Sequence, residues 1–105
     1  MLDRLGIADE MKPKTVFLPK AGPIGFLVAN GQAEMVVQPL QLLIPVAGIE
    51  IVGPLPGDLQ EIEVFAAAIM GGTKDAAASK ALVNFLRTPE SAKVIKEKGM
   101  EPGIK

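Results

Sequence analysis

The chain has 105 residues, enough for one small domain, and its net charge of −1 gives no general attraction to nucleic acid or to an anionic membrane. It has no Cys and no His, so the thiolate nucleophile, the usual general base and the commonest metal ligands are missing. No pair among the scattered carboxylates stands out as an acid–base couple, so the sequence predicts no enzyme, no cofactor and no metal site.

The first half of the chain alternates short helices with apolar extended runs. Helical spacing of apolar residues predicts a helix over residues 1–11. Proline at the start and glycine at the stop predict another from Pro23 to Gly31. Residues 15–18 and 35–37 are β-branched and apolar and predict two strands, and a helical turn is expected over 41–44.

The second half predicts two strands and then two helices. Residues 49–52 alternate like a half-buried strand, and 61–70 predict a longer strand that ends at a Gly-Gly turn. Thr73 or Asp75 is expected to cap the first helix. The second is expected to begin at Thr88-Pro89-Glu90, with Thr as the N-cap.

The order α-β-α-β-β-β-α-α predicts an α/β fold with several strand–helix crossovers. The elements form two unequal groups, and neither has the five or so strands of a typical sheet. We therefore expect an incomplete mixed sheet with flanking helices, and we expect its open edges to be completed by self-association.

Four stretches together resemble one family. They are LDRLGIADEMKPKT, NGQAEMVVQ, LIPVAGIEIVGPLPGDLQ and AAASKALVNFLRTPESAKVIKEKGMEP. In this order they resemble the C-terminal half of bacterial extracytoplasmic solute-binding proteins of the molybdate-binding type, associated with ABC transporters.

The resemblance implies a partial type II periplasmic-binding-protein fold, in which two lobes close on a ligand that is delivered to a membrane ABC permease. Residues 1–38 would belong to the second lobe, 39–61 to the hinge, and 62–105 to a segment returning to the first lobe. The chain would then be a fragment of a periplasmic or extracytoplasmic protein, with Met1 an internal methionine or a truncated start. Its first residues are acidic and contain no signal peptide.

The candidate ligand site is the segment around Gly22 together with the end of the 35–37 run. Main-chain N–H groups at a helix start bind oxyanions, and the resemblance places a second contact just after the strand. The expected ligand-binding residues are Ala21, Gly22, Ile24, Gln38 and Pro39. Gln38 hydrogen-bonds an oxyanion such as molybdate or a small organic solute equally well.

Two functions stay open at this point. The chain is either a ligand-binding part of a transport receptor, or a fragment that self-associates into a homodimer and binds no small ligand. In the second case the turn at Gly22 merely redirects the chain, and Gln38 merely satisfies main-chain groups.

Overall fold

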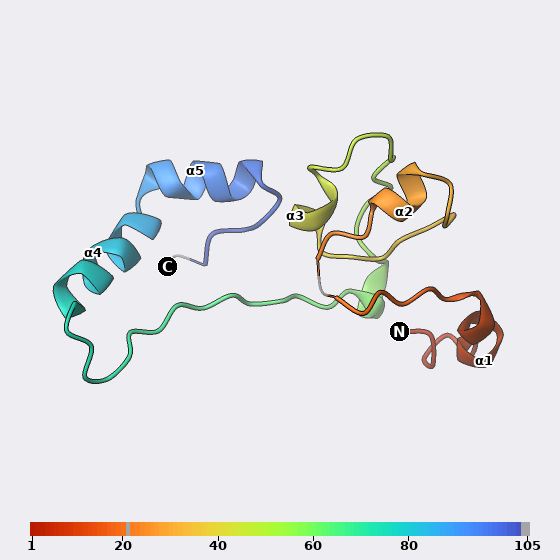
Figure 1. Cartoon of the computed structure of the whole chain (residues 1–105), viewed down its shortest axis with the longest axis horizontal. Helices are drawn as coiled ribbons and strands as arrows, with labels where there is room; N and C mark the ends of the chain where they lie inside the picture. Colours follow the sequence, from red (N-terminus) through yellow and green to blue (C-terminus); the bar gives the residue numbers. More distant parts are fainter. Residues whose placement is uncertain (21, 104–105) are drawn as a thin grey trace. The chain divides into compact units, whose positions relative to one another are not determined.

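The computed structural model describes residues 1–20 and 22–103 and divides into two units, Met1–Glu61 and Ile62–Lys105. Figure 1 follows the helices of each unit along the chain. Ala21, one of the five expected site residues, lies outside the described residues.

The first unit is built from single helical turns joined by irregular chain. Its elements are α1 (Ala8–Met11), η1 (Lys12–Lys14), α2 (Phe26–Ala29), α3 (Leu40–Leu43) and η2 (Gly57–Leu59). The expected turn over 41–44 is confirmed as α3. The expected stop of α2 at Gly31 is confirmed as well, since this glycine has a φ of 73°, in the left-handed region.

Gly25 is the tightest packing point of the first unit. It is buried and helical, with a φ of −57°, directly before α2. A Cβ atom built on it would lie 3.2 Å from Val46 Cγ2 and 3.4 Å from both Ile49 Cδ1 and Leu43 Cδ2. A large side chain is therefore excluded here because the main chain approaches these side chains closely, and the backbone angles themselves do not require glycine.

The second unit contains the two longest helices, α4 (Ala76–Leu86) and α5 (Pro89–Glu97). The cap predicted at Thr88 is confirmed: its hydroxyl accepts a hydrogen bond from the Ser91 N–H at 3.3 Å, with Pro89 at the first helical position. Before α4, the Thr73 hydroxyl accepts from the Asp75 N–H at 3.2 Å, whereas the N-cap residue Asp75 makes no side-chain cap bond.

Substitution of the Thr88 cap provides a first prediction. We expect Thr88→Ala to destabilise α5 by about 1 kcal/mol, because the first turn loses the hydroxyl that accepts from the Ser91 N–H. Thr88→Ser retains that hydroxyl and should behave like the parent chain. The loss would appear as reduced helical signal in circular dichroism on heating. Equal melting of the Ala and Ser variants would contradict the cap.

The expected α/β fold with a mixed sheet is wrong. Within residues 1–20 and 22–103 there is no strand, and the runs 15–18, 35–37, 49–52 and 61–70 are not paired with one another. The alternating and β-branched patterns mark segments suited to a sheet, but a strand exists only when a neighbour takes up its main-chain groups. The expected completion of this sheet by self-association is therefore wrong as well.

The helix expected over residues 1–11 is only partly present. Residues 2–6 form turns, and α1 begins at Ala8. Gly6 adopts a φ of 70°, which a continuous helix does not allow, so the helical spacing of the apolar residues does not produce a long helix here.

Apolar side chains in the described residues are half-buried or exposed, and none is buried. The only buried residues there are Gly25 and Ser91. Val52 is 97% exposed and Phe17 83%. Burial of apolar surface is the main favourable term in folding, so a covering partner would stabilise either unit. The expected division of the chain into a part of the second lobe (1–38), a hinge (39–61) and a segment returning to the first lobe (62–105) remains a prediction.

Candidate functional site

The side chain of Gln38 connects two segments of the first unit that lie far apart in sequence. Its Oε1 accepts a hydrogen bond from the Ile24 N–H at 3.1 Å, and its Nε2 donates one to the Gly22 carbonyl at 2.7 Å. Both bonds are partly shielded from water. A single carboxamide thus closes the turn between Gly22 and Ile24, and we call this arrangement the Gln38 clasp.

The local sequence explains why the clasp forms at this turn. Gly22 has a φ of 149°, which favours glycine, and Pro23 between the bonded groups has no N–H of its own. After Gln38 the chain turns at once into α3, because the Pro39 carbonyl accepts from the Leu42 N–H at 3.0 Å. Gln38 is therefore held between an extended segment and a helical turn.

The structure brings together three of the predicted site residues. Gly22, Ile24 and Gln38 are joined directly by the two bonds of the clasp, and Pro39 follows as the N-cap of α3. The predicted use of the Ile24 N–H as an anion donor meets a competitor, because this N–H already donates to Gln38. The helix after it, α2, is a single turn, so its dipole adds little.

The two bonds of the clasp use one N–H and one acceptor position of the Gln38 carboxamide, and a second of each remains. A glutamine NH₂ can donate twice and its oxygen can accept twice, and the clasp uses one bond on each side. Gln38 is half-buried, and among residues 1–20 and 22–103 its second N–H has no hydrogen-bond partner. An oxygen-rich solute could take that N–H without opening the turn.

An ion pair lies elsewhere in the first unit. The Arg4 guanidinium pairs with the Asp58 carboxylate and also donates to the Asp58 carbonyl at 2.7 Å. Both side chains are largely exposed, so the pair contributes little to stability. The pair connects the N-terminal turns with η2.

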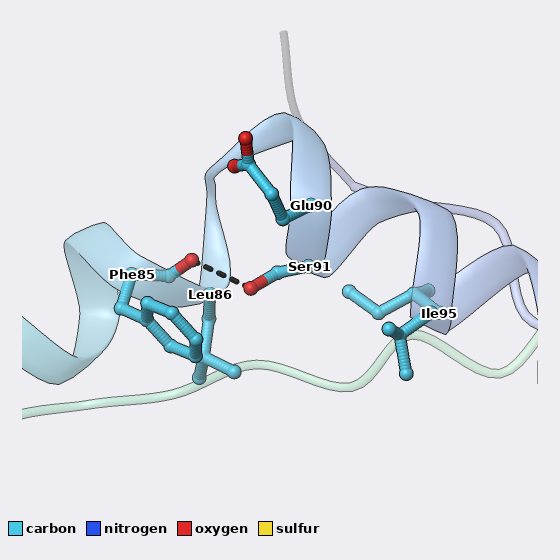
Figure 2. Close-up of a pocket in the computed structure, with 6 residues that line it drawn as sticks. Phe85, Leu86, Glu90, Ser91 and Ile95 are labelled. Atoms are coloured by element: carbon cyan, nitrogen blue, oxygen red, sulfur yellow. Dashed lines mark hydrogen bonds between the residues drawn. The ribbon is translucent and has the colours of Figure 1, made fainter.

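The second unit contains a pocket that the sequence did not predict. It has a volume of about 260 Å³ and is lined by Phe85, Leu86, Glu90, Ser91, Val94 and Ile95. In Figure 2 the Glu90 carboxylate points away from the side chains of Phe85, Leu86 and Ile95, so the lining is apolar. The sequence signal that could have predicted this pocket is the set of apolar residues on both sides of the Thr88-Pro89 cap.

Ser91 fixes the corner that shapes this pocket. Its hydroxyl donates to the Phe85 carbonyl at 2.7 Å, drawn as the dashed line in Figure 2. The Thr88 hydroxyl donates to the same carbonyl at 2.9 Å. The last turn of α4 is thus tied to the first turn of α5.

In the described part of the chain, no three His, Cys, Asp or Glu side chains gather closely enough to hold a metal ion. No helix formed by residues 1–20 and 22–103 has the length and apolar character needed to cross a membrane.

Comparison with known proteins identifies the family. The pattern of the bacterial extracellular solute-binding proteins matches residues 1–101, and the chain belongs to this family. The resemblance to solute-binding proteins is therefore confirmed at the level of the family. The family's description is of extracellular proteins, in agreement with the expected extracytoplasmic location.

One curated relative has a name that states an activity. It is an aconitate isomerase from a Pseudomonas species, 30% identical over 102 residues. The alignment covers 97% of this chain and 38% of the relative, so the chain spans well under half the length of that protein. No solved structure matches the chain.

Proposed function

We propose that this chain binds a small anionic solute at the Gln38 clasp, without chemical conversion, as part of an uptake system with a membrane ABC permease. Membership of the solute-binding family supports binding as the general activity. The observation that carries the location is the Gln38 carboxamide, which is fixed by two hydrogen bonds and has a second N–H without a partner among the described residues.

The ligand class follows from the second N–H of the Gln38 side chain, the donor that the clasp leaves for a ligand. N–H groups recognise acceptor oxygens, which molybdate, similar oxyanions and organic carboxylates all offer. The relative's name links that protein to aconitate, an organic anion. We therefore propose oxyanions and organic carboxylates as one ligand class, with Gly22, Ile24, Gln38 and Pro39 at the contact.

Calorimetric titration with molybdate, tungstate, sulfate and aconitate tests this proposal. We expect saturable heat for at least one of the four anions. Gln38→Ala should weaken that binding at least about tenfold, because the turn loses both bonds of the clasp and the ligand loses a donor. A complete absence of heat with all four anions would contradict the proposal.

Gln32→Ala is the matched control for this titration. Gln32 is exposed, and its main-chain N–H donates to the Leu27 carbonyl at 2.8 Å, a bond that the substitution retains. The variant should bind as the parent chain does. Equal weakening by the two substitutions would mean that the clasp is not the site.

Binding without chemistry can be separated from isomerase activity in one experiment. The name of the Pseudomonas relative makes an isomerase the natural alternative. Incubating the chain with aconitate and following the solution by proton NMR would show any second isomer as it forms. An unchanged spectrum agrees with our proposal, and conversion proportional to protein concentration would refute it.

A further inference from the structure

We draw no further inference here: the strongest candidate, the apolar face at the corner between α4 and α5 with its pocket of about 260 Å³, is unpartnered, and nothing in the described part of the structure shows what covers it.

Discussion

Gly25→Val should destabilise the packing of the first unit by about 2 kcal/mol, because an added side chain would overpack a closely filled contact. The Cβ atom alone would lie 3.2 Å from Val46 Cγ2, and valine adds two further methyl groups. Hydrogen exchange of the Leu27 and Val28 amides, which donate to the Ile24 and Gly25 carbonyls, measures the local opening.

Two further substitutions bracket this effect. Gly25→Ala should be nearly neutral, because the end of the Val46 side chain can move by a few tenths of an ångström and alanine favours the helical conformation. Gly71→Val is the control, since a Cβ atom there would meet nothing within 4 Å. Faster exchange of the α2 amides in the Gly71 variant, or unchanged exchange in Gly25→Val, would refute the packing role of Gly25.

Gln38→Glu should open the clasp and weaken anion binding more than Gln38→Ala does. At neutral pH the new carboxylate can accept from the Ile24 N–H, but it cannot donate to the Gly22 carbonyl, which lies 2.7 Å from Nε2 in the parent chain. Two acceptors would then face each other, at a local cost of about 2 kcal/mol. The negative charge would also repel the proposed ligand.

The effect of Gln38→Glu should depend on pH in a defined direction. Protonation restores an O–H donor toward the Gly22 carbonyl, so the folded clasp favours the protonated acid and raises the pKa of the introduced group above about 4.3. An acid whose pKa is raised on folding loses stability as the pH rises. Exchange of the Ile24 amide should therefore slow on acidification, relative to Gln32→Glu measured at the same pH.

Local signals were the part of the fold that the sequence predicted well. The Thr88-Pro89-Glu90 cap and the stop at Gly31 both depend on a few neighbouring residues, and both are present. The strands failed because pairing depends on a distant partner. Residues 61–70 have the composition of a strand, yet they pair with no other segment among residues 1–20 and 22–103.

The candidate site shows the same contrast between local signals, which the sequence predicts, and contacts between distant residues, which it does not. Family resemblance pointed to Gly22 and Gln38 separately, on either side of α2. Their hydrogen bond joins residues 16 positions apart, and its existence depends on the path of the intervening chain. The apolar pocket at the corner between α4 and α5 depends on the angle between two helices, which residue spacing alone does not fix.

The central claim, anion binding at the Gln38 clasp, is tested most directly by amide NMR during titration with the anion that gives the strongest calorimetric signal. Our account predicts saturable shifts of the Ile24 amide and of the Gln38 side-chain NH₂ resonances, with a shared midpoint. Saturable shifts confined to other residues, with these two signals unmoved, would contradict it.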